Sequence, residues 1–222
     1  MLHPPNMKSL MLPAALVLLL ACQYEPAKSD NASVNKSTTN DNETLWIQQI
    51  QTIRYQQKRD SLRALLPQWL RSNNFNTAQV IIADLSMHSG LPRMVLMDVQ
   101  TGKVLDSGMV AHGAGGDAFA ATARFSNVPN SYCSSLGRYR IGGSYKGNFG
   151  TAYKLHGLEA SNSNAYERLV VLHAYDCVPD TIPYPDMICN SLGCPMISYN
   201  FLKRLSKKIA ASEKPMLLWI IN

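Results

Sequence analysis

The sequence has no dense block of basic residues, and nowhere do aromatic and basic side chains alternate along a stretch. Its net charge of +6 is therefore dispersed, and no nucleic-acid partner is expected. The most pronounced apolar run, residues 10–20, is interrupted by Pro13 and is too short to cross a membrane. Internal repeats and Cys-x-x-Cys pairs are absent, which excludes repeat architectures and the commonest structural zinc motif. What remains is a chain of 222 residues, long enough to bury one substantial core.

The N-terminus is typical of an export signal rather than of a folded segment. A short positive start at Met7-Lys8 and an apolar run lead to Leu19-Leu20-Ala21-Cys22, which resembles a bacterial lipobox. In this interpretation residues 1–22 are a lipoprotein signal peptide, Cys22 carries the lipid, and the protein lies on the periplasmic face of the outer membrane. The alternative is an ordinary signal peptide and a soluble periplasmic product.

Composition divides the rest of the chain into three parts. Residues 23–43 are rich in Ser, Asn, Thr, Asp and Lys, which predicts a flexible tether. Residues 44–76 have helical periodicity, and their apolar stripe is expected to pack on the domain formed by residues 77–222. That stripe comprises Leu62, Leu65, Leu66, Trp69 and Leu70.

The segment 77–222 has the texture of a mainly β domain with peripheral helices. Strands are expected at 78–84, 93–99, 104–112, 152–155, 166–173 and 216–221, and a basic helix at 199–212. The glycine- and serine-rich segment 113–150 is expected to form loops and short strands around a site.

Two segments together indicate cysteine chemistry. Ser191-Leu192-Gly193-Cys194 places a thiol directly after a glycine, and the apolar strand that ends in His173 lies upstream. A thiol needs a base to become a nucleophilic thiolate, and an imidazole is the usual one. Glycine permits the tight turn and close approach that an oxyanion pocket requires. The alternatives are an inert thiol and a strand-end histidine with a satisfied hydrogen bond.

The other cysteines bear on this interpretation. Cys177 and Cys189 flank a proline-rich loop, and in an exported protein they are candidates for a disulfide that leaves Cys133 buried and Cys194 free. Four cysteines allow three full pairings, so the connectivity stays open. A zinc site built from His173, Cys177, Cys189 and Cys194 is disfavoured by their spacing, and no metal or cofactor is expected.

Further upstream, His112-Gly113-Ala114-Gly115-Gly116 follows a strand and forms either a pocket lined by backbone donors or a mobile loop. The hydroxyls of Ser134 and Ser135 are candidates for facing a substrate. These motifs come in an order, with Tyr145-x-Gly147-x-x-Gly150 and Leu155-x-Gly157 between them and the Cys194 segment. Over residues 78–200 this order resembles the murein L,D-transpeptidase catalytic domain family (the YkuD-like superfamily).

The resemblance implies a β-sandwich-like catalytic domain that acts on peptidoglycan stem peptides. Cys194 would attack the carbonyl before a D-Ala and form a thioester, with His173 as the base. The N–H groups of Gly193 and Cys194 would hold the oxyanion, and Ser191 would position the loop or assist the imidazole. His112 and Gly113 would lie near the substrate channel, beside Ser134 and Ser135.

One departure concerns recognition of the substrate. Better-known members carry an arginine or asparagine two residues after the cysteine, where this chain has Met196. Arg138, Arg140, Lys146 and Lys154 are the candidates that compensate. The alternatives are a carboxypeptidase or lipoprotein-releasing hydrolase on the same scaffold, and a non-catalytic wall-binding lipoprotein.

Overall fold

The computed structural model describes residues 53, 56–58, 60–116 and 120–222. All of these belong to one compact unit, residues 38–222. The expected signal peptide with Cys22, the tether and the first part of the helical segment lie outside the described residues. Among the helices of the described part, none is long and apolar enough to cross a membrane.

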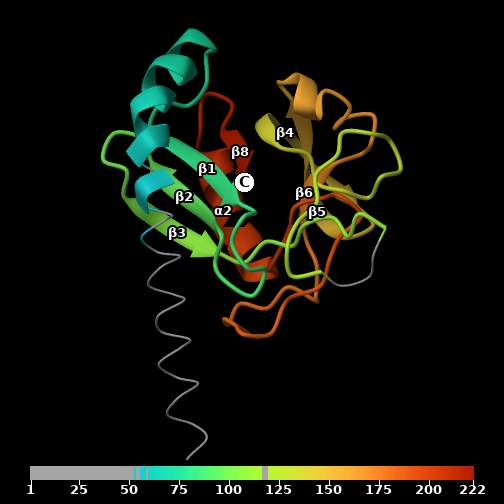
Figure 1. The fold of residues 1–222 in the computed structure, drawn as a ribbon. Coiled ribbons are helices and arrows are strands. Elements are labelled where there is room, and N and C mark those ends of the chain that lie inside the picture. Colours follow the sequence, from blue (N-terminus) through green and yellow to red (C-terminus); the bar gives the residue numbers. More distant parts are fainter. Residues whose placement is uncertain (1–52, 54–55, 59, 117–119) are drawn as a thin grey trace, which may run out of the picture. The chain divides into compact units, whose positions relative to one another are not determined.

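Eight strands form a single mixed sheet in the order β3-β2-β1-β8-β4-β5-β6-β7. The strands are β1 (Gln79–Asp84), β2 (Met94–Asp98), β3 (Val104–Gly108), β4 (Gly137–Gly147), β5 (Gly150–Gly157), β6 (Val171–Ala174), β7 (Met196–Ile197) and β8 (Leu217–Ile221). The β1–β8 and β6–β7 pairs are parallel and the others antiparallel. Figure 1 shows β1–β3 on one side of β8 and β4–β6 on the other. The mainly β fold expected from the sequence is confirmed.

Alternation along β1 explains the two layers around the first half of the sheet, because successive side chains point to opposite faces. Ile81 and Ala83 belong to the core shared with helix α2 (Tyr199–Ala210). Val80 and Ile82 belong to the core shared with the helical residues 60–72. The strands β1, β2 and β8 are therefore covered on both faces.

The stripe expected on the N-terminal helix is mostly correct. Leu66 and Leu70 are fully buried against the sheet, and Leu62 and Trp69 pack at its edge. Leu65 is the exception, since 64% of it is exposed. The helix ends where Asn74 adopts a left-handed conformation, and the Phe75 N–H then bonds to the Leu70 carbonyl, a common termination.

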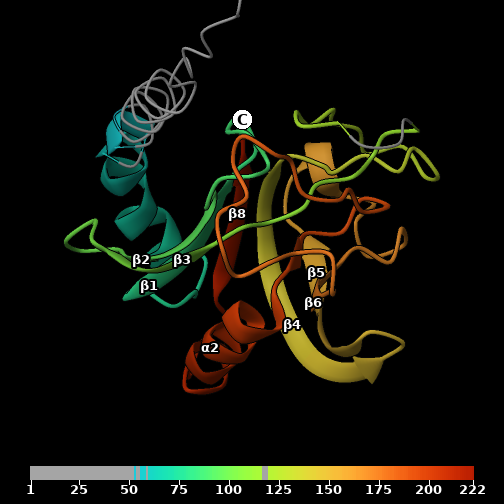
Figure 2. The same ribbon diagram turned by 90° about the horizontal axis from the view of Figure 1, so that it is seen from below.

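The strand β4 is longer than expected, because the glycines and serines of residues 113–150 suggested loops and short strands. It is eleven residues long and curves strongly along its length (Figure 2). Its first half alternates inward at Tyr139 and Ile141, while its outer half is exposed. A shift of register between Ile141 and Ser144 marks the change. The strand expected at 166–173 is shorter, because turns occupy residues 163–169 and β6 begins only at Val171.

Candidate active site

His173 lies near the end of β6, between Ala152 of β5 and Met196 of β7. Its ring Nδ1 is 3.1 Å from the carbonyl oxygen of Ala174, so Nδ1 carries the hydrogen and Nε2 keeps a free lone pair. Burial lowers the pKa of His173 below its ordinary value, which favours the neutral ring. A neutral imidazole with an open Nε2 is the state that a general base requires.

An aromatic side chain covers this imidazole. Phe149, in the tight turn between β4 and β5, stacks on the His173 ring with centroids 5.0 Å apart and meets Tyr175 edge-on. As a result only 3% of His173 is exposed, although Phe149 itself is half exposed. Neither Phe149 nor the Ala174 carbonyl has a local signal in the sequence, since the long β4–β5 hairpin places the ring.

The thiol lies on a turn that depends on glycine. Gly193 has a φ of 115°, which favours glycine, and Ser191 stabilises the turn on both sides. The Gly193 N–H donates to Ser191 Oγ at 3.1 Å, and that hydroxyl donates to the Cys194 carbonyl at 2.6 Å. The Gly193 N–H is therefore occupied, whereas the Cys194 N–H has no hydrogen-bond partner among the described residues.

Cys194 is a free, partly buried cysteine that borders β6. Its Sγ accepts the Val171 N–H at 3.4 Å and donates to the Leu169 carbonyl at 3.7 Å. Val171 and His173 are two residues apart on β6, so the Val171 N–H that meets the thiol lies about 7 Å along the strand from the backbone of His173. Among the described residues, no hydrogen bond joins the thiol to the imidazole. Catalytic hydrogen bonds are often long in unliganded enzymes, so this geometry is compatible with a thiol–imidazole pair.

Electrostatic effects on the thiol oppose one another. Burial raises the pKa of the Cys194 thiol, and this is the largest effect. The Val171 N–H and the positive charge of Arg168 act in the opposite direction, because both favour the thiolate. Arg168 has a role that the sequence did not suggest, and its contacts are described below.

The two serines expected to face a substrate are buried in the scaffold of the site. Ser134 Oγ accepts the Gly113 N–H at 3.0 Å and donates to the Gly193 carbonyl at 3.3 Å. Ser135 Oγ lies 3.1 Å from the hydroxyl of Tyr139. These hydroxyls therefore hold the segments around the thiol together.

Gly113 is also inside this scaffold. A Cβ at Gly113 would lie 2.1 Å from the Tyr132 carbonyl oxygen, so only glycine fits. Its backbone bridges to Ser191, next to the thiol turn. Gly113 thus shapes the site through the close approach of two backbones.

His112 is fully buried beneath the site. Arg93 can only donate, so its Nη2, 2.6 Å away, fixes His112 Nδ1 as an acceptor. The Nε2 atom lies 3.1 Å from the Thr122 carbonyl and 3.2 Å from Asn190 Nδ2. Burial and the neighbouring Arg93 charge lower the pKa of His112 to about 4. This network holds Asn190, the residue just before Ser191, in place. Nothing in the local sequence around Asn190 predicts this role.

Arg138 is not brought to the thiol. Its guanidinium lies over the ring of Trp69, 4.5 Å from the centroid, and pairs with Glu159. Arg138 therefore holds the N-terminal helix against the sheet. In the pairing of β4 with β8, Arg138 lies opposite Trp219.

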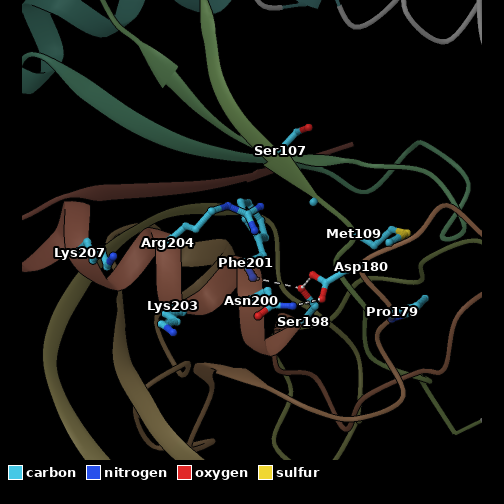
Figure 3. Close-up of a pocket in the computed structure, with 11 residues that line it drawn as sticks. Ser107, Met109, Pro179, Asp180, Ser198, Asn200, Phe201, Lys203, Arg204 and Lys207 are labelled. Atoms are coloured by element: carbon cyan, nitrogen blue, oxygen red, sulfur yellow. Dashed lines mark hydrogen bonds between the residues drawn. The ribbon is translucent and has the colours of Figure 1, made fainter.

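Cys177 and Cys189 are joined in a disulfide with a Cα–Cα distance of 5.9 Å, the pairing considered from the sequence. The loop between them docks on the start of α2 at a cavity of about 410 Å³. Figure 3 shows the side chains of Asp180, Ser198 and Asn200 pointing toward one another at this cavity. Asn200 Nδ2 donates to Asp180 Oδ2 at 2.6 Å, and the Ser198 hydroxyl donates to Oδ1. Within the described ranges, no three His, Cys, Asp or Glu side chains gather as a metal site would require.

Comparison with known sequences identifies the class. A sequence model of the L,D-transpeptidase catalytic domain matches residues 50–218, about three quarters of the chain. The chain belongs to the L,D-transpeptidase catalytic domain family, whose members are typically enzymes of the cell wall. No curated protein matches the chain.

Solved structures give more distant likenesses. An L,D-transpeptidase from Xylanimonas cellulosilytica is 14% identical, with a TM-score of 0.37 over 64% of this chain and 60% of that one. L,D-transpeptidase 1 of Mycobacterium tuberculosis is 13% identical, with a TM-score of 0.34 over 65% and 62%. The helical cell shape determining protein Pgp2 from Campylobacter jejuni is 10% identical, with a TM-score of 0.42 over 64% and 47%. The chain thus spans less than two thirds of each of these, and the assignment to the family rests on the sequence model.

Proposed function

We propose that the protein is a cysteine acyltransferase of the cell wall that acts on peptidoglycan stem peptides. The observation that carries this proposal is the free Cys194 thiol on the Gly193 turn, which bonds to the backbone of β6 at Val171, two residues before the neutral imidazole of His173. In a chain of the L,D-transpeptidase family, this is the pair that the acyl-transfer chemistry needs.

In the proposed reaction, His173 Nε2 accepts the thiol proton as Cys194 Sγ attacks the carbonyl carbon before a D-Ala. The sulfur first leaves its hydrogen bonds to the backbone of residues 169 and 171 by rotating toward the imidazole. The Cys194 N–H stabilises the oxyanion, because the Gly193 N–H already bonds to Ser191 Oγ. The C–N bond then breaks, the imidazolium returns its proton to the leaving amine, and a thioester remains.

The thioester is resolved by an acceptor that attacks the same carbonyl. An amine gives a new amide and a crosslink, while water gives a shortened stem peptide. In both cases His173 removes the proton of the acceptor and returns it to the departing sulfur.

Acylation of the full chain by a carbapenem tests the nucleophile. We expect wild-type protein to gain the mass of one carbapenem, and Cys194→Ala to gain none while keeping its circular dichroism spectrum. Cys133→Ala is the matched control, because Cys133 is the other free cysteine among the described residues and is buried. Acylated Cys194→Ala would overturn the proposal.

A purified tetrapeptide muropeptide then identifies the acceptor. Products are separated and weighed after incubation with the folded protein. Dimers indicate transfer to an amine and tripeptides indicate hydrolysis. An unchanged muropeptide together with an unreactive Cys194 would favour a non-catalytic wall-binding protein.

We also propose export and a lipid anchor at Cys22, supported by the signal-like N-terminus and by a family that acts on the wall. The periplasmic face of the outer membrane is the expected location. A wild-type chain that incorporates no labelled palmitate in a bacterial host, with Cys22→Ala as the reference, would contradict the anchor.

A further inference from the structure

Arg168 is the centre of a cluster of hydrogen bonds directly beside the thiol turn. Its Nη1 donates to the Ser126 carbonyl at 2.9 Å and to Ser135 Oγ at 3.1 Å. Its Nη2 donates to the Cys133 carbonyl at 2.6 Å and to Ser131 Oγ at 3.4 Å. One guanidinium thus donates to four acceptors in the segment 126–135. That segment contains no helix, so side-chain hydrogen bonds of this kind hold its conformation.

The same guanidinium lies beside the thiol turn. A Cβ at Gly193 would lie 3.3 Å from Arg168 Nη2 and 2.9 Å from the Cys133 carbonyl oxygen that Arg168 binds. On the other side, Arg168 is three residues before Val171, whose N–H holds Cys194 Sγ. Arg168 is therefore linked to the turn through space and to the sulfur through the start of β6.

Among the described residues, no carboxylate forms an ion pair with Arg168. In the described part of the chain, the ion pairs join Lys58 to Asp84, Arg138 to Glu159 and Arg204 to Asp106. No carboxylate among those residues pairs with Arg168, which is half-buried. A positive charge that is partly shielded from water acts more strongly on a nearby thiolate than an exposed one does.

The other titratable groups around this charge form no ion pair with it in the described part of the chain. The Tyr139 hydroxyl donates to the Ser135 carbonyl, and burial raises its pKa to about 12, so it is neutral. The His173 ring is neutral as well, and the neighbouring Glu167 is exposed. The remaining groups on the packed elements are Cys133, Arg124 and Glu159, and the Glu159 carboxylate is already paired with Arg138.

We propose that Arg168 is a positioning residue of the cysteine site, which fastens the segment 126–135 against the Gly193–Cys194 turn and holds near the sulfur a positive charge that forms no ion pair among the described residues. This inference rests on the proposed function only in that it makes Cys194 the reactive group. Arg168, just before β6, would thus favour ionisation of the Cys194 thiol although that thiol is buried.

Alkylation of Cys194 by iodoacetamide as a function of pH tests the proposal on the full chain. Mass spectrometry of the Cys194 peptide separates this thiol from the other cysteines. We expect Arg168→Gln to react about tenfold more slowly at pH 7, with the midpoint of the pH profile moved upward, because the charge that favours the thiolate is lost. Arg168→Lys keeps the charge and is expected to stay within about threefold of wild type.

Arg140→Gln is the matched control, because Arg140 is an exposed arginine on β4 outside the cluster. It should leave the profile unchanged. If Arg168→Gln slows alkylation equally at every pH, with the midpoint unmoved, Arg168 is only structural and the proposal fails. The result is independent of the carbapenem test, because alkylation needs a thiolate and no acyl-transfer activity.

Salt provides a second measurement should Arg168→Gln fail to fold. In wild-type protein, raising the salt from about 0.05 to about 0.5 M shortens the screening length and weakens the influence of a half-buried charge by a small amount, less than it weakens that of an exposed charge. The midpoint should then move upward. Two results together would overturn the proposal. The first is a wild-type midpoint that does not respond to salt, and the second is an Arg168→Lys profile that differs from wild type in both midpoint and rate.

Discussion

The strands β1, β2 and β8 lie between two apolar layers, whereas the thiol and imidazole border loops that polar side chains tie together. In the first region, Val80 and Ile82 face the N-terminal helix while Ile81 and Ala83 face α2, and all four are fully buried. In the second region, hydrogen bonds from Ser, Asn and Arg side chains to backbone atoms do most of the fastening.

This contrast separates stability from reactivity. Apolar burial is non-directional and stabilises the fold in proportion to the buried area. Side-chain hydrogen bonds are directional, so they hold a turn in one geometry and set the charge around it. Changes in the apolar region should therefore alter the free energy of unfolding, and changes in the polar region should alter the chemistry.

The largest expected effect is in the apolar region. Leu70→Ala removes a fully buried side chain between the helix and the sheet and should lower the free energy of unfolding by about 2–5 kcal/mol. Leu65→Ala, on the same helix but 64% exposed, should change it by no more than about 0.5 kcal/mol. Urea denaturation followed by circular dichroism measures both.

The rate of Cys194 alkylation in the folded Leu70→Ala protein should stay within about twofold of wild type, since residue 70 lies outside the polar cluster. A Leu70→Ala variant that unfolds normally but loses thiol reactivity would break the separation of the two regions.

A smaller effect is expected where His112 lies between the regions. Its pKa is lowered to about 4 from an ordinary 6.5, so the unfolded chain binds a proton between these values and the folded chain does not. Stability should thus fall as the pH drops from about 6.5 to about 4, by about 3 kcal/mol from this group. Protonation is unfavourable because Arg93 already places a buried cation beside the ring. His173, also buried with a lowered pKa, contributes in the same direction.

Urea midpoints between pH 7 and pH 4 measure this dependence. His112→Gln, less stable at pH 7, should show a flatter profile than wild type. His156→Gln is the control, because His156 is only partly buried, and its profile should stay close to that of wild type. A His112→Gln profile as steep as wild type would show that acid acts elsewhere.

Local patterns in the sequence were sufficient to predict the strands of the apolar region, and they single out the thiol and the imidazole of the proposed site. The strands near 79–84, 94–98 and 217–221 follow from alternating or continuous apolar residues. The thiol after Gly193 and the histidine ending an apolar strand are equally local signals. Leu65 shows the limit of periodicity, because the edge of a helical stripe can face water.

Features that depend on distant pairing could not be predicted in the same way. The glycines of β4 suggest loops, and only its pairing with both β5 and β8 makes it a strand. That strand directs Arg138 to Trp69 instead of to the thiol. Ser134 and Ser135 face the scaffold because Gly113 and Arg168 meet them there, contacts between segments far apart in the sequence.

The smallest expected effect is on the pKa of His173 when Phe149, the aromatic side chain that stacks on its ring, is removed. Phe149→Ala removes the ring stacked on His173, so water reaches the imidazole and its pKa should rise toward the ordinary value. Phe149→Tyr keeps the ring and should leave the pKa close to that of wild type. The ring-proton shifts of His173 in NMR spectra recorded across pH measure this change.

Unfolding by urea should be almost unaffected, because Phe149 is half exposed and belongs to neither apolar layer. If the pKa of His173 is the same in Phe149→Ala and in wild type, its burial comes from the strands on either side and Phe149 is not its cover.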